Sequence, residues 1–128
     1  MKFTTEKSFE ILTRTPIIIE NLLSGLPDDW IYNNEGNDTW SPFDVVGHLV
    51  VGEKTDWITR MQIILGDAAD KKFKVFDRFK QLRDNVNVPL SQLIQEFKML
   101  RQQNLEILKK IKFDEATLNR TGIHPEFG

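Results

Sequence analysis

The sequence predicts an all-α fold, a helical bundle built on three long helices. Two segments of the 128-residue chain place apolar residues at alternating spacings of three and four, the period of a helix with one buried face, and a third segment combines a strong helix start with an apolar run. The chain also lacks β-hairpin signals, internal repeats and low-complexity tracts. Its length fits a single domain over residues 1–128.

The first helix is expected near the N-terminus, where the apolar seam consists of Phe9, Leu12, Pro16, Ile19, Leu23 and Leu26. Thr15 before Pro16 resembles a helix cap followed by the proline that a first helical turn tolerates. We therefore expect a break or kink near Thr15, giving two short helices or one kinked helix. Gly25 and Pro27 end the segment, and the turn-rich stretch 28–39 predicts a loop.

The second helix is predicted from Pro42 to about Leu65. Ser41 can cap it, Pro42 suits the first helical position, and Asp44 occupies the capping-box position three residues after the cap. Residues 45–52 are apolar on every side of the helix, apart from one histidine. This pattern is typical of a helix that other elements surround.

The rest of the chain holds a third long helix between two irregular stretches. Residues 67–89 lack a sustained period and are expected to form a loop and a short helix that lays aromatic side chains over the core. The third helix is predicted from about Leu90 to Ile111, with Asn104 as the polar member of its seam. Residues 114–128 contain many turn residues and predict a loop.

Composition and charge exclude several classes of function. The 17 Lys and Arg residues are offset by 19 Asp and Glu residues, for a net charge of −2, so nucleic-acid binding is disfavoured. The absence of cysteine removes thiolate nucleophiles and Cys-ligated metal centres. No apolar stretch approaches the roughly 20 residues of a membrane span, and we see no secretory signal. We therefore expect a cytoplasmic protein that binds no membrane.

His48 is the first candidate for chemistry. It lies in the apolar half of the second predicted helix, and Gly52 one turn later leaves room for a metal, a ligand or a close helix. An imidazole in apolar surroundings needs a polar partner. Two interpretations stay open: a metal ligand whose partners come from elsewhere in the fold, and a neutral core histidine hydrogen-bonded to one neighbour. The other histidine, His124, lies in a predicted loop, where a solvated or locally hydrogen-bonded side chain is the simpler interpretation.

Four charged residues could line a pocket near His48 or orient a bound ligand. They are Glu53, Asp56, Arg60 and Asp77. The first three follow His48 on the same predicted helix, and an ordinary solvated face is the alternative for Asp56 and Arg60. Asp77 belongs to the aromatic stretch that comes later and, with Arg78, could place a charge pair at the edge of the core.

Two polar residues of the third predicted helix, Arg101 and Asn104, are three positions apart and so share one side of it. They could place charge at the core from that helix. Alternatively, Asn104 could fix the helix register, as buried polar residues of a helical seam sometimes do.

The second predicted helix carries a family resemblance. Residues 40–49 read Trp-Ser-Pro-Phe-Asp-Val-Val-Gly-His-Leu and are followed by Gly52-Glu53 and by Asp56-Trp57-Ile58-Thr59-Arg60. This combination of a cap, a histidine and a downstream Glu/Trp pattern closely resembles the DinB-like (YfiT-like) family of metal-dependent enzymes. Shorter supporting matches extend along most of the chain, at residues 14–16, 76–79, 96–105 and 122–128.

The resemblance implies an up-down four-helix bundle with a divalent metal, often nickel or zinc, held by three histidines. His48 matches the ligand of the second helix, and the other two form an HxxxH pair on the fourth helix, where both imidazoles share one face. Such a metal keeps positions open to activate water or a thiol. The implied enzyme is a thiol transferase or hydrolase with a small thiol or electrophile as substrate, and the resemblance assigns no further catalytic residue.

The chain contains no HxxxH, and His124 matches neither of the remaining ligands. We therefore expect residues 1–128 to stop before the final helix of the bundle and a longer chain to carry the pair after Gly128. The alternative is a non-catalytic module that forms a homodimer through its open apolar groove, with His48 in a structural role.

Overall fold

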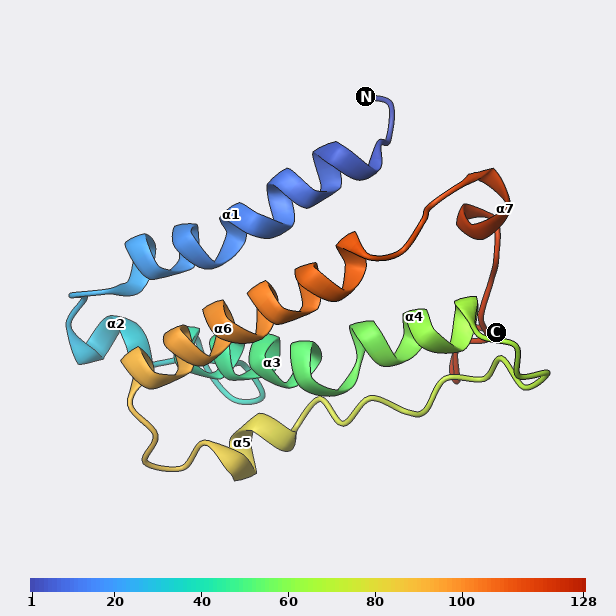
Figure 1. Ribbon diagram of the computed structural model, residues 1–128. Coiled ribbons are helices and arrows are strands. Elements are labelled where there is room, and N and C mark those ends of the chain that lie inside the picture. The colour runs from blue at the N-terminus through green and yellow to red at the C-terminus, as the bar shows by residue number, and fades with distance from the viewer.

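Three long helical segments form the frame of the protein in the computed structural model, which describes residues 1–128 (Figure 1). The elements are α1 (Thr5–Leu23), α2 (Asp28–Tyr32), α3 (Pro42–Thr55), α4 (Trp57–Leu65), α5 (Lys80–Asp84), α6 (Leu90–Lys109) and α7 (Glu115–Leu118). Helix α6 packs against both α1 and α3. The only pairing of extended backbone is an isolated bridge between Lys72 and Ile123. The predicted all-α class is confirmed.

Helix α1 is continuous through Pro16, so of the two predicted forms the structure excludes two short helices and leaves a single helix. A proline inside a helix has no N–H, which leaves the carbonyl four residues earlier without its helical donor. That carbonyl belongs to Leu12, and it accepts a hydrogen bond from Arg101 Nη1 of α6 at 2.9 Å. A side chain from α6 thus supplies the donor that Pro16 lacks.

The predicted loop 28–39 begins with a short helix, α2, which corrects the prediction. Asp28 and Asp29 lie in its first turn, where negative charge interacts favourably with the helix dipole. Ile31 is only 2 % exposed and anchors the turn in the core. A single helical turn is too short to show a period in sequence, so its existence depends on this buried contact.

The second predicted helix is interrupted at Asp56, so it forms α3 and α4 instead of one uniform helix. The predicted capping box is present, with the Ser41 amide donating to Asp44 Oδ2 at 3.0 Å and the Asp44 amide donating to Ser41 Oγ at 3.2 Å. At Asp56 the dihedral angles are φ −115° and ψ −68°. The indole of Trp57 then packs over Gly52, where a Cβ would lie 3.1 Å from its Nε1 atom.

The core lies between α3 and α6, where Val46, Leu93 and Ile94 form a buried cluster. Helix α6 starts at the predicted residue and ends two residues before the predicted end. Helix α5 is the short helix expected in the irregular stretch before α6, and it packs closely on α3 at Gly47. A Cβ at Gly47 would lie 3.0 Å from Cβ of the buried Gln81 side chain, so the missing side chain permits this contact.

The predicted loop 114–128 contains the short α7 and folds back beside the end of α4 (Figure 1). The Phe73 amide donates to the Ile123 carbonyl at 2.9 Å, and the Ile123 amide donates to the Lys71 carbonyl at 2.8 Å. Lys71 Nζ and Arg120 Nη1 each donate at 2.6 Å to a carbonyl at the end of α4. These bonds hold the C-terminal stretch against the chain that follows α4.

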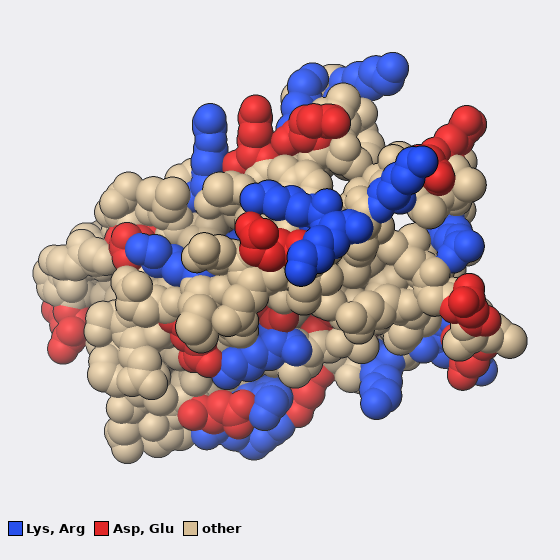
Figure 2. All heavy atoms as spheres, in the orientation of Figure 1, with Lys and Arg blue, Asp and Glu red and all other residues tan.

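The visible face of the molecule carries acidic and basic side chains interspersed with each other (Figure 2). This face shows no continuous basic patch of the kind that phosphate backbones attract. None of the helices combines the length and the apolar character that a membrane crossing requires.

Candidate functional site

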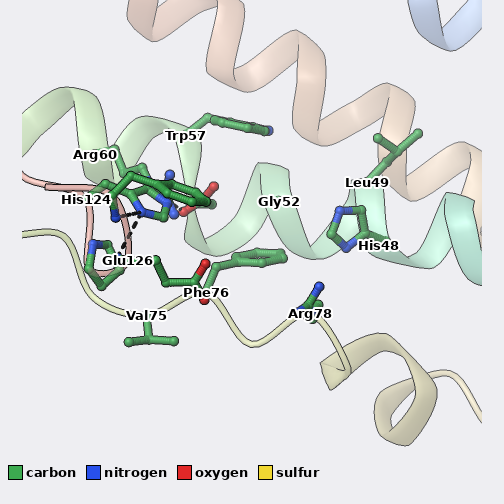
Figure 3. Close-up of a pocket in the computed structure, with 13 residues that line it drawn as sticks. His48, Leu49, Gly52, Trp57, Arg60, Val75, Phe76, Arg78, His124 and Glu126 are labelled. Atoms are coloured by element: carbon green, nitrogen blue, oxygen red, sulfur yellow. Dashed lines mark hydrogen bonds and ion pairs between the residues drawn. The ribbon is translucent and has the colours of Figure 1, made fainter.

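One pocket, with a volume of about 380 Å³, contains the candidate histidine His48. Three parts of the chain form its walls: the α3–α4 segment, the stretch 75–78 that follows α4, and the C-terminal stretch 124–127 (Figure 3). The lining residues are His48, Leu49, Gly52, Asp56, Trp57, Arg60, Val75, Phe76, Arg78, His124, Pro125, Glu126 and Phe127. The volume lies in the range of small-molecule sites.

The imidazole of His48 packs against two aromatic rings. Its centroid is 4.9 Å from that of Trp40 and 5.2 Å from that of Phe76, which meets it edge to face. Burial lowers the pKa of His48, and the nearby Asp56 carboxylate opposes this only in part. The Nδ1 atom is buried and has no hydrogen-bond partner in the protein. The lowered pKa favours the neutral imidazole, the protonation state that metal ligation requires.

Asp56 and Arg60 form an ion pair in the wall of the pocket. Asp56 Oδ1 lies 2.6 Å from Arg60 Nε, and the two side chains are only 9 % and 19 % exposed. The N–H direction departs from hydrogen-bond geometry, so the contact is an ion pair alone. The Arg60 guanidinium also lies over the Phe73 ring, with Cζ 5.1 Å from its centroid. The two charges compensate each other, and Arg60 is held in place from two sides.

Glu53 does not line this pocket. Its side chain is 4 % exposed and lies between α3 and α6, where Oε1 accepts hydrogen bonds from Arg101 Nε at 2.9 Å and Arg101 Nη2 at 2.6 Å. Asn104 Nδ2 donates to Glu53 Oε2 at 2.8 Å and to the Glu53 carbonyl at 2.9 Å. A position five residues after His48 lies about 140° around a helix from it, so the two side chains leave different sides of α3.

Asp77 also lies outside the pocket lining. Its carboxylate is bound by Arg83, and this hydrogen bond, together with one from the Phe79 amide, lowers the pKa of Asp77. Of the four charged candidates, the structure therefore brings two, Asp56 and Arg60, into one pocket with the candidate histidine.

His124 joins His48 in the pocket although the two lie far apart in the chain, and the sequence carries no signal for this proximity. Its Nδ1 atom accepts hydrogen bonds from the amides of Glu126 at 3.1 Å and Phe127 at 3.3 Å. Its ring also stacks on that of Phe127, with centroids 4.8 Å apart. A neutral His124 whose Nδ1 accepts carries its proton on Nε2, so it offers a hydrogen-bond donor.

The residues of this chain fit one coordination position of a three-histidine centre. His48 has a lowered pKa and lacks a partner at Nδ1, and both features suit a ligand. His124 uses Nδ1 to hold its own loop, and Nε2 could ligate a metal only by giving up the proton that this arrangement places there. No three His, Asp or Glu side chains converge in the structure, so residues 1–128 do not form a complete metal site.

Three long helices with a histidine-bearing pocket beside them define a helical bundle of the kind that places small-molecule or metal sites between its elements. Comparison with known families identifies it further: the model of the DinB superfamily matches residues 11–128. The chain belongs to the DinB superfamily.

A solved structure shares the fold. It is YfiT from Bacillus subtilis, described as a probable metal-dependent hydrolase with an unusual four-helix bundle topology. The TM-score is 0.77 at 17 % sequence identity, and the match covers 97 % of this chain and 71 % of that chain. A search of curated proteins found no match.

Proposed function

We propose that this chain belongs to a metal-dependent enzyme in which His48 is one ligand of a divalent ion, nickel or zinc. The observation that carries the proposal is the placement of His48, whose imidazole packs against Trp40 and Phe76 and whose buried Nδ1 atom has no hydrogen-bond partner. An unsatisfied buried polar atom costs free energy, and metal ligation is one way to recover it. Membership of the DinB superfamily and the fold shared with YfiT, a probable metal-dependent hydrolase, support the same function.

Because residues 1–128 supply one histidine of the required kind, the proposal places the remaining ligands on a histidine pair outside these residues. A divalent ion bound in such a site lowers the pKa of a water or thiol, which is the chemistry of a hydrolase or of a thiol transferase acting on a small thiol and an electrophile. The residues described here would hold and orient the reactants. Phe76 and Trp57 provide apolar walls, and the Asp56–Arg60 pair keeps the charge of its wall balanced.

Thermal denaturation of the full encoded protein with and without Ni²⁺ or Zn²⁺ tests this proposal. An ion present at about 100 times its Kd stabilises the folded state by about 2.7 kcal/mol, which raises the Tm. We expect the rise in the unmodified protein and in His124→Gln, and its loss in His48→Gln. His124→Gln is the matched control because it removes a histidine from the same pocket. A rise that His48→Gln retains would contradict the proposal.

A second candidate function is a non-catalytic module that forms a homodimer. The observation that favours it is an apolar surface on α1, where Ile11, Ile18 and Leu22 are 61 %, 60 % and 67 % exposed. Exposed apolar side chains gathered on one helix mark association surfaces. Light scattering over a range of concentrations distinguishes the two functions. A metal-independent dimer that Ile18→Glu dissociates would favour the non-catalytic module, with His48 in a structural role. A monomer would exclude the module.

A further inference from the structure

Two cations line the pocket, Arg60 and Arg78, and one of them is paired with an acid. Arg60 is paired with Asp56, as described above. In the neighbouring segment, Lys80 lies 2.6 Å from Asp84, measured from Nζ to Oδ2. Arg78 has no ion pair with any acid.

The isolation of Arg78 has a structural cause. The acid next to it in sequence, Asp77, is occupied by Arg83 and by the Phe79 amide. The guanidinium of Arg78 lies against the Phe79 ring, whose centroid is 5.6 Å from Cζ. Its five N–H donors are therefore free for an acceptor that the protein does not provide.

Arg78 lies at the same end of the pocket as His48 (Figure 3). The two carboxylates that line the pocket belong to Asp56 and Glu126. Asp56 is neutralised by Arg60, and Glu126 lies toward the other end of the pocket (Figure 3). The end that contains His48 and Arg78 thus carries an uncompensated positive charge.

A guanidinium presents a planar fork that matches a carboxylate with two parallel hydrogen bonds. Aromatic side chains, Phe76 and Trp57, form part of the pocket wall and suit an apolar carbon skeleton. We propose that Arg78 is the specificity-determining residue of this pocket, which takes a small organic acid with its carboxylate on Arg78 and its apolar part against Phe76. Glu126 disfavours ligands with a second acidic group at the far end.

A carboxylate bound to Arg78 places the adjoining carbon atoms of the ligand at the end of the pocket that contains His48. The inference rests on the proposed function only in treating this ligand as a substrate of the metal centre. Binding itself requires no metal. The test is therefore a binding measurement without metal, so that it fails or succeeds independently of the metal titration above.

The probes are phenylacetate and phenylacetamide, which share their shape and differ in charge, titrated at low ionic strength and followed by two-dimensional NMR. We expect the acid to bind about tenfold more tightly than the amide, as charge-assisted hydrogen bonds allow, and to shift the amide signals of residues 75–78. Arg78→Gln should remove the preference, and Arg78→Lys should keep only part of it because it retains the charge without the fork. Arg14→Gln is the matched control, an exposed arginine of α1 outside the pocket, and should keep the preference in full.

Three results would overturn the inference: equal affinity for the two probes, no binding of phenylacetate, or the same loss of preference in Arg14→Gln and Arg78→Gln. A preference that depends on Arg78 in a protein whose Tm does not respond to metal would support the inference while the metal-dependent function fails. The reverse outcome, a metal response through His48 with no preference for the acid, would retain the enzyme and reject this substrate class.

Discussion

Replacing Arg101 with methionine is expected to destabilise the protein by about 3–5 kcal/mol, the cost of breaking a buried ion pair by removing one partner. The magnitude follows from three contacts. The guanidinium donates twice to Glu53 Oε1 and once to the carbonyl of Leu12, which has no helical donor because Pro16 follows it by four residues. Methionine keeps an apolar stem near Phe97 but leaves a carboxylate that is 4 % exposed without its cation.

Urea unfolding followed by circular dichroism measures this cost, and a second substitution tests its origin. The pair Arg101→Met and Glu53→Leu should be less destabilising than Arg101→Met alone, because the unpaired charge is then gone. Arg14→Met, at an exposed position of α1, should change the free energy of unfolding by no more than about 0.5 kcal/mol. A loss below about 1 kcal/mol for Arg101→Met, or a double variant as unstable as the sum of the two single ones, would refute the reasoning.

Three further predictions concern single positions. Burial lowers the pKa of His48, so the unfolded chain binds more protons than the folded one as the pH falls below the unfolded value of about 6.5. The free energy of unfolding should therefore decrease as the pH falls through this range. In urea unfolding, His48→Gln should flatten this part of the pH profile, and identical profiles for the two proteins would contradict the prediction. Gly47→Ala should lower the free energy of unfolding by about 1–3 kcal/mol, because its Cβ would lie 2.7 Å from Asn85 Nδ2 and crowd α5. Thermal denaturation measures this loss, and an unchanged Tm would show that α5 moves aside without cost. Ser41→Ala should cost about 1 kcal/mol in urea unfolding through loss of the cap of α3, whereas Ser24→Ala, which removes no capping side chain, should have little effect.

The features that were predicted correctly depend on residues close together in sequence. The capping box of α3 joins Ser41 to Asp44, and the start of α6 at Leu90 follows from a regular apolar seam. The sequence does not predict the interruption at Asp56, because the apolar pattern continues across it. The packing of Trp57 beside this position is a contact that no periodicity reports.

The continuity of α1 also depends on a residue that is distant in sequence. Local rules place a break at Pro16, since a proline removes a helical hydrogen bond. The helix persists because Arg101 of α6 donates to the freed carbonyl of Leu12. The same guanidinium binds Glu53, so one side chain links α1, α3 and α6.

The all-α class, the three long helical segments and the place of His48 on the second of them all follow from the amino-acid sequence, because helical period and caps are local properties of the chain. The charges that accompany this histidine depend instead on how the helices and loops pack. Packing directed Glu53 to the interior between α3 and α6 and brought Arg78 and His124 into the pocket. The physical reason is that the surroundings of a side chain come from segments that are distant in sequence and share no local pattern with it.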